Sequence, residues 1–494
     1  MIKKRNTSPL TLVFLLGTGL TLFQACAPQS NYKIPTIDLP ETYRGQSDSI
    51  ATQDSLSISA IKWRDFFQDE QLTRLIDKGL AHNFDMQNAL KNLEIATQQT
   101  KQAKMEWLPS LGLEAGSVAY QYRSENYYGT PSTNYYKNKG EEAPTNMYVN
   151  SAQYTSGLSL SWELDIWGKI KSQTAEQLAR FLQTAEAKKA VQTELIANIA
   201  AGYYNLLLLD AQMEVAQTNY ELTKNTLKIV ELQRDAGQIT SLAITQTKNQ
   251  MLVAKALIPS LKQQIAIQEN ALSLLTGQLP TNIVREVKLA EVKQEELGST
   301  GLPLALLQYR PDVQMAEFEL KAKNAAVGVA QTARYPSLTI NLEGGVNSML
   351  GENWFNIPGS LFGSLIGKVA NPIFNKRKLK TAFEVAKIER TKSEIDFQKT
   401  VYTAVTEVTD ALVNLKTSEE QIQIADEQVT TSRLGVKQSN LLFNSGYATY
   451  IEVINAQKNM LDNELNLNKL KLNKLQYGVQ LYKSLGVVGN SKLV

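Results

Sequence analysis

Two parts of the chain alternate apolar and polar side chains with a period of two. In the segment 154–166 the even positions are mostly apolar, among them Leu158, Leu160 and Trp162, whereas the odd positions are polar or acidic. The segment 337–346 repeats this alternation. Successive side chains of a β-strand point to opposite faces, so the pattern predicts strands with one apolar and one polar face.

We expect four strands, near 109–122, 151–166, 336–349 and 361–374. A half-buried sheet of a soluble domain and a membrane barrel share this alternation, and both interpretations fit it. Four strands cannot close a barrel, because bacterial membrane barrels begin at eight, and an open sheet edge cannot face lipid. The barrel interpretation therefore requires several copies, and three copies give twelve strands and room for a lumen.

A long helix is predicted after each strand pair. Apolar residues recur three and four positions apart over Lys169–Asp235 and Lys376–Phe443. An ordinary coiled coil or helical bundle has the same periodicity, but about 67 residues span roughly 100 Å, several times the width of a compact domain. Shorter helical segments at 69–107, 240–275 and 303–335 provide a return path of similar length. We expect a helix break near His82. We also expect a bend at Pro259, because a proline inside a helix removes a backbone hydrogen bond.

The two halves of the chain are related by a tandem duplication. Gly237 and Gly446 lie 209 positions apart, and the segments 210–216 and 273–277 match others at the same offset. Three matches at one offset indicate two structurally equivalent repeats. The predicted organisation is a first repeat at 61–280, an equatorial linker at 281–302, a second repeat at 303–486 and a C-terminal tail at 487–494.

The N-terminus has the pattern of a secretory signal. Basic residues at 3–5 precede an apolar stretch from Leu10 to Phe23, and Cys26, the one cysteine of the chain, follows Ala25. The cysteine could be a free thiol in a discarded segment, but its position resembles a bacterial lipobox. We therefore predict a lipoprotein signal peptide at 1–25, acylation of Cys26 and a polar, proline-containing tether at 26–60.

Composition argues against catalysis and nucleic-acid binding. The formal net charge is +3, from 51 basic and 48 acidic side chains, so no strongly basic field is available for nucleic acid. His82 is the one histidine of the sequence, which excludes a multi-histidine metal site. No glycine loop with a phosphate-binding lysine is present. We expect no enzyme activity, no cofactor and no metal site, and an α+β fold that is mostly helical.

The stretch Leu307–Val313 contains the motif Arg310-Pro311-Asp312. Together with Tyr335–Leu338 and the aromatic residues after Trp63, it resembles the TolC family of outer-membrane factors, in its NodT or OprM-like lipoprotein branch. By itself the motif indicates a helix start, with Pro311 at the first helical position and Asp312 favoured by the helix dipole.

The resemblance implies a homotrimer with a twelve-stranded barrel in the outer membrane and a helical barrel in the periplasm. It also implies two partners, a periplasmic adaptor of the membrane fusion type and an inner-membrane pump of the RND type. The chain would then be a lipid-anchored, outer-membrane efflux channel of a Gram-negative bacterium that passively conducts small molecules. A type I secretion duct for polypeptides and a non-conducting structural lipoprotein of the periplasm are the alternatives.

The resemblance also assigns residues at the periplasmic end. The turns at Gly237 and Gly446, with Thr240 and Thr449 beside them, would contact the adaptor, although glycine suits any tight connection between helices. In relatives, polar and acidic side chains constrict the lumen near these turns. Here the possible gate residues are Glu452, Asn455 and Asp462, and an asparagine at position 455 departs from the acidic pattern; a solvated helix face explains them equally well.

Overall fold

The computed structural model describes residues 32–35, 37, 63–123, 139–140, 149–292 and 309–486. The predicted signal peptide, Cys26, most of the tether, the end of the linker and the tail at 487–494 lie outside the described residues. The chain divides into two compact units. Of the described residues, the sheet unit contains those within 98–178 and 321–390, and the helical unit contains those within 33–97, 179–320 and 391–486.

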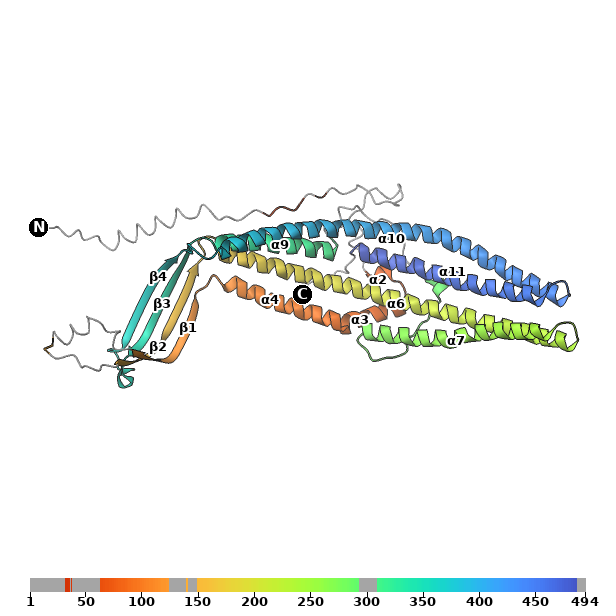
Figure 1. Cartoon of the computed structure of the whole chain (residues 1–494), viewed down its shortest axis with the longest axis horizontal. Helices are drawn as coiled ribbons and strands as arrows, with labels where there is room; N and C mark the ends of the chain where they lie inside the picture. The colour runs from red at the N-terminus through yellow and green to blue at the C-terminus, as the bar shows by residue number, and fades with distance from the viewer. Residues whose placement is uncertain are drawn as a thin grey trace. The chain divides into compact units, whose positions relative to one another are not determined.

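The sheet unit contains one antiparallel sheet of four strands in the order β1-β2-β3-β4 (Figure 1). The strands are β1 (Ser110–Arg123), β2 (Val149–Leu164), β3 (Ser337–Ser348) and β4 (Leu361–Ala370). All four predicted strands are present. The fourth ends four residues earlier than predicted, and Pro372, which has no backbone N–H to donate, follows two residues later.

The register of the sheet explains the alternation in the sequence. Leu160 of β2 lies opposite Leu111 of β1 and Leu342 of β3, and Leu342 lies opposite Leu365 of β4. One face of the sheet is therefore apolar across all four strands. The outer strands β1 and β4 are the edges of this sheet.

The long helices confirm the duplication. Helices α6 (Lys169–Asp235) and α10 (Lys378–Asn444) both have 67 residues, and α7 (Ser241–Leu275) and α11 (Tyr450–Ser484) both have 35. The beginning and end of each first-half helix lie 209 positions before those of its counterpart. Helix α6 forms a hairpin with α7, and α10 forms one with α11 (Figure 1).

Shorter helices precede each strand pair. Helices α4 (Phe84–Met105) and α9 (Pro311–Thr332) both have 22 residues and lie 227 positions apart. The offset falls from 227 to 209 across the strands, so the first repeat contains 18 more residues between its short and its long helix. The duplication is therefore strict in the helices and relaxed around the strands.

The predicted helix 69–107 is divided, as the expected break near His82 required. Helix α3 (Glu70–His82) begins at Asp69, whose carboxylate accepts hydrogen bonds from the backbone N–H groups of Gln71 and Leu72. It ends at Asn83, which has an extended backbone. Helix α7 continues through Pro259, so the residue leaves a missing hydrogen bond inside the helix, and the bend remains a prediction.

The core of the helical unit combines aromatic and aliphatic side chains. Phe66, at the end of the short helix α2 (Trp63–Phe66), stacks on Tyr482 of α11 at a centroid distance of 5.3 Å, and Phe67 meets both rings. The hydroxyl of Tyr203 in α6 donates to Asp69 at 2.9 Å. The segment around Trp63 therefore packs between the two repeats, because it contacts helices of both.

The described part of the linker is packed against this core. Ile283 and Leu289, the latter in the short helix η4 (Leu289–Glu291), are buried. Arg285 lies between them and forms ion pairs with Asp210 at 2.5 Å and Glu269 at 2.6 Å. Burial alone would lower the pKa of Arg285, but its hydrogen bonds and ion pairs with these two carboxylates outweigh burial and raise it.

Candidate functional site

The two predicted adaptor turns have the same backbone geometry. We use the name tip turns for Gly237–Thr240 between α6 and α7 and Gly446–Thr449 between α10 and α11. Gly237 and Gly446 have φ angles of 75° and 80°, in the left-handed region that favours glycine. A Cβ at either position would meet nothing within 4 Å, so glycine is required by the backbone and not by crowding.

The helical hairpins pack against each other beside the tip turns. Val230 and Ala243 of the first hairpin form a buried apolar cluster with Phe443 and Val453 of the second. Thr240 and Thr449 are the N-cap residues of α7 and α11. The structure therefore brings the two tip turns to the same end of the helical unit.

Two side-chain hydrogen bonds join the hairpins in this region. The hydroxyl of Tyr450 donates to Oε1 of Gln246 at 2.6 Å, and Nε2 of Gln457 donates to the hydroxyl of Thr226 at 2.8 Å. Neither pair was predicted, because the four residues are common on helix surfaces and no spacing in the sequence pairs them. Both bonds connect helix α11 to the first hairpin.

A buried polar layer lies beside the Gln457 bond. Asn219, Thr223 and Thr226 of α6 and Gln457 of α11 are each at most 3% exposed. Neither polar side-chain atom of Asn219 has a hydrogen-bond partner within the described residues. Unsatisfied buried polar groups lower stability, so this part of the contact between hairpins is weaker than an apolar one would be.

The three predicted gate residues are exposed on α11. Glu452 and Asn455 are three positions apart and Asp462 follows after two further turns, so they share one stripe of the helix. The carboxylate of Glu452 accepts a hydrogen bond from the backbone N–H of Thr449 at 2.8 Å. This bond gives Glu452 a structural role as a helix cap. Asp462 lines an open groove of about 750 Å³ between α10 and α11.

Arg310 of the sequence motif is a buried side chain that contacts three helices. Its side chain is 7% exposed and pairs with Asp312 at 2.6 Å and Glu407 at 2.7 Å. Nη1 donates to the backbone carbonyl of Ser484, near the end of α11, at 2.9 Å. Burial alone would lower the pKa of Arg310, but the hydrogen bonds and charges of Asp312 and Glu407 raise it.

Asn83 performs the same task in the first repeat. Its Nδ2 donates at 3.0 Å to the carbonyl of Leu275, the last residue of α7. Asn83 and Arg310 precede the equivalent helices α4 and α9, and Leu275 and Ser484 end the equivalent helices α7 and α11. Each side chain thus joins the start of a short helix to the end of a long hairpin, and we call these contacts the two helix joints.

A glycine allows the close approach at each helix joint. Gly277 and Gly486 have φ angles of 68° and 67°. A Cβ on Gly277 would lie 2.3 Å from the carbonyl oxygen of His82, and one on Gly486 would lie 2.8 Å from the Cα of Arg310. The motif around Arg310 was predicted as a family feature. Arg310 lies 227 residues after Asn83, the same offset as between α9 and α4, and this offset could have revealed the equivalent joint at Asn83.

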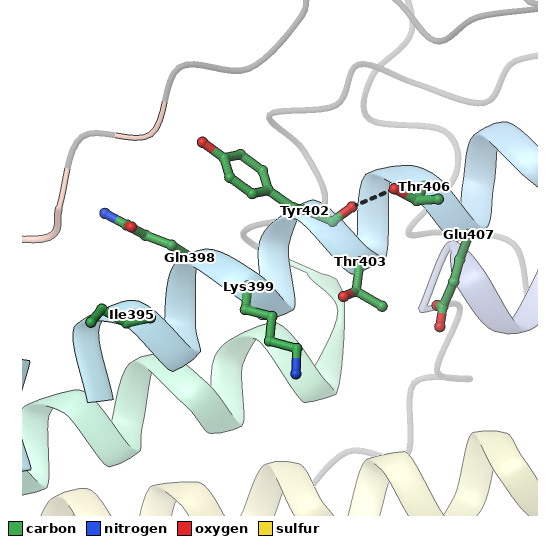
Figure 2. A pocket seen from close by; sticks show the side chains of 7 residues that line it. All are labelled: Ile395, Gln398, Lys399, Tyr402, Thr403, Thr406 and Glu407. Carbon is green, nitrogen blue, oxygen red and sulfur yellow. Dashed lines mark hydrogen bonds between the residues drawn. The ribbon is translucent and has the colours of Figure 1, made fainter. Parts of the chain in front are cut away.

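A shallow hollow of about 460 Å³ lies on α10 in the helical unit (Figure 2). Its seven lining side chains all come from this helix, and they include the exposed Ile395 and Tyr402 as well as Glu407. A hollow formed by one helix is an open surface and does not enclose a substrate.

Within the residues that the structure describes, no group of three histidine, cysteine or acidic side chains could hold a metal ion. None of the described helices has both the length and the apolar composition that crossing a bilayer requires.

The chain matches a known protein family over most of its length. The family model for outer membrane efflux proteins matches residues 75–278 and 302–487, which include most of the first repeat, all of the second and both helix joints. The chain belongs to the outer membrane efflux protein family.

Relatives match over nearly the full length. The solvent efflux pump outer membrane protein SrpC of Pseudomonas putida is 29% identical over 489 residues, which cover 98% of each chain. The cation efflux system protein CusC of Escherichia coli K12 is 27% identical over 485 residues, covering 96% of this chain and 98% of CusC.

Solved structures share the fold. The open state of the MtrE outer membrane channel of Neisseria gonorrhoeae has a TM-score of 0.80 at 23% identity and covers 93% of this chain and 98% of its own. A membrane protein of Pseudomonas aeruginosa has a TM-score of 0.82 at the same identity and covers 93% of this chain and all of its own.

The comparisons confirm the main sequence predictions. This efflux protein is an outer-membrane component of an efflux system, and the predicted fold class is correct. Trimeric assembly with an adaptor and a pump is the arrangement of the family. The family consists of channel proteins.

The Arg310 joint can be tested by Arg310→Gln. The change removes a buried cation and its bond to the Ser484 carbonyl, so the free energy of unfolding should fall by about 2–4 kcal/mol. Arg74→Gln is the matched control because Arg74 forms an exposed pair with Glu70, and its cost should stay below about 0.5 kcal/mol. Denaturant unfolding of the purified proteins measures both, and equal effects would contradict a special role for Arg310.

Proposed function

We propose that three copies of this chain form a continuous duct that carries small molecules out of the periplasm and contributes no catalytic step. The observation that carries the proposal is the strict duplication of two long hairpins, each following a pair of strands. In this arrangement the three sheets close into a barrel of twelve strands, and the hairpins form the wall of a helical tunnel.

Two exposed features support assembly from several copies. Strands β1 and β4 leave unpaired edges that a neighbouring sheet satisfies, because every backbone group in lipid needs a partner. Ile395 and Tyr402 on α10 are exposed and seven residues apart, which is the spacing of a coiled-coil contact. Both edges and this helix face are available for a second copy.

The cargo is inferred from the relatives. SrpC is named for solvent efflux and CusC for cation efflux. We infer that this chain also conducts small solutes, supplied by an inner-membrane pump of the RND type through an adaptor. A polypeptide cargo remains the second candidate, because a pump chooses the cargo and the duct does not.

The bond between Tyr450 and Gln246 is proposed to hold the periplasmic end closed. Tyr450→Phe removes its hydroxyl and lets α11 move away from the first hairpin, so the open probability in single-channel recordings should rise several-fold. Tyr447→Phe is the control, since the Tyr447 side chain is 85% exposed. A duct whose Tyr450→Phe variant gates like wild type would not use this bond as a latch.

Contact with the adaptor at the tip turns can be tested in cells that lack the gene. Wild-type protein should restore resistance to small toxic compounds, whereas Gly446→Asp should not, because it adds bulk and charge where the adaptor docks. Aspartate tolerates the left-handed backbone, so the fold should persist. Gly435→Asp, at a half-buried glycine within α10 where an added Cβ would meet nothing within 4 Å, should complement fully. Complementation by both variants, or a defect confined to polypeptide export, would refute this assignment.

Cys26 is proposed to carry the lipid anchor. Mass spectrometry of the mature N-terminal peptide should show acyl chains on Cys26 and none in a Cys26→Ser variant. An unmodified cysteine in the mature protein would rule out the anchor and leave the duct unaffected.

A further inference from the structure

The end of the sheet at which the helices begin has an excess of positive charge. Ser110 of β1 lies opposite Ser161 of β2, Leu338 of β3 lies opposite Leu164, and Ser337 lies opposite Ala370 of β4. The start of β1 and β3 and the finish of β2 and β4 therefore lie at the same end of the sheet. We call the segments next to this end the helical rim, namely 101–109, 163–171, 334–336 and 371–380. The rim carries nine basic side chains and three acidic ones (Lys101, Lys104, Lys169, Lys171, Arg334, Lys376, Arg377, Lys378, Lys380; Glu106, Glu163, Asp165).

Two of the three rim acids, both at the beginning of α6, have internal partners. Glu163 pairs with Lys169 at 2.9 Å. The carboxylate of Asp165 accepts hydrogen bonds from the backbone N–H groups of Ile170 and Lys171, both at 2.9 Å. These acids therefore cap and neutralise the beginning of α6.

The second repeat lacks this arrangement. Lys376, Arg377, Lys378 and Lys380 are exposed, and none forms an ion pair with another residue that the structure describes. These four neighbouring cations are therefore available to an external counter-charge.

The backbone at this position is unusual for side chains of this kind. Lys376 and Arg377 have φ angles of 43° and 64°, and Arg377 stands 209 positions after Gly168, whose φ angle is 75°. Glycine fits the left-handed conformation without steric cost, as it does in the first repeat. In the second repeat two cations occupy these strained positions, and their side chains form no ion pair inside the described chain.

Large apolar side chains accompany the cations. Ile373 is 95% exposed and Phe374 is 86% exposed. In the first repeat the aromatic residue of the junction is held, because Trp167 donates to the carbonyl of Pro336 at 2.8 Å and packs against Tyr335. The second junction thus presents apolar side chains followed by cations, which suits the boundary between acyl chains and charged head groups.

This boundary continues an exposed apolar surface. Leu158 and Leu365, on the apolar face of the sheet, are 52% and 73% exposed. The apolar face would lie in the membrane in the proposed duct, and the helical rim would lie at the membrane surface on the periplasmic side. The inference rests on the proposed function for this orientation.

We propose that the helical rim binds the head groups of anionic phospholipids. Ile373 and Phe374 enter the acyl-chain region, and the Lys376-Arg377-Lys378 run contacts the phosphates. Each cation near an anionic surface favours binding, and the three-fold assembly presents the run three times.

A neighbouring copy is the other occupant to consider. When β4 of one copy pairs with β1 of the next, the segment 101–109 of the next copy lies near the second junction. This segment carries Lys101 and Lys104 and one acid, Glu106. Its balance is positive, so direct contact would place like charges together, whereas an anionic lipid between the copies neutralises both.

The test compares a rim variant with a distal variant of equal charge. Lys376→Gln, Arg377→Gln and Lys378→Gln are combined in one protein, and Lys228→Gln, Lys437→Gln and Lys458→Gln, on exposed positions of the helical unit, in the other. Native mass spectrometry of the full chain in detergent measures the binding of phosphatidylglycerol and phosphatidylcholine. Wild type and the distal variant should prefer phosphatidylglycerol, and the rim variant should bind it roughly tenfold or more weakly. Glycerol 3-phosphate at the same concentration should not compete.

Several outcomes would overturn the proposal. Equal phosphatidylglycerol affinity in the rim and distal variants would do so, as would a rim variant that separates into monomers, since the run would then serve the contact between copies. Conductance of the rim variant should match wild type. A wild-type protein that neither trimerises nor conducts would contradict the proposed function, and the lipid comparison between variants would still decide the rim.

Discussion

The geometry of the helical unit depends on hydrogen bonds at two places where a helix ends and another begins. The last carbonyls of a helix have no partners within it, and a buried helix end without partners is costly. Here Asn83 and Arg310 each donate a side-chain N–H to such a carbonyl, of Leu275 and Ser484 respectively. The carbonyl end of each long hairpin thereby meets the N-terminal end of a short helix, an arrangement in which the two helix dipoles attract.

The two joints reach the same result with different chemistry. The first uses a neutral amide, and the second uses a cation that also binds the carboxylates of Asp312 and Glu407. The side chain of Arg310 therefore bonds to α9, α11 and, through Glu407, α10, whereas the side-chain amide of Asn83 donates to α7 alone. This extra connection ties the middle of α10 to α9 and to the end of α11.

Much of the fold could be predicted from the sequence, because its elements are long and periodic. The bounds of α6 and α7 agree with the prediction to within one residue, and the alternation of apolar and polar positions predicted the strands β2 and β3. The site was harder. The tip turns were found through glycines at a fixed offset, but the bond between Tyr450 and Gln246 joins residues 204 positions apart that have no distinctive spacing. Glu452 was predicted as a possible gate residue from its position, but the structure also shows its carboxylate accepting a hydrogen bond from the nearby backbone N–H of Thr449. Position in the sequence does not distinguish these two roles.

The equal lengths of the paired helices limit how this protein can change. Removing one turn from α6 alone would withdraw the Gly237 turn by about 5.4 Å from the Gly446 turn and would shift the packing of Val230 against Phe443. A compensating loss in α7, α10 and α11 would be needed to restore both the turns and the joints. Insertions and deletions of single turns in the hairpins should therefore persist only when they occur in both repeats together, whereas the connections around the strands, where the repeats already differ by 18 residues, are free to vary.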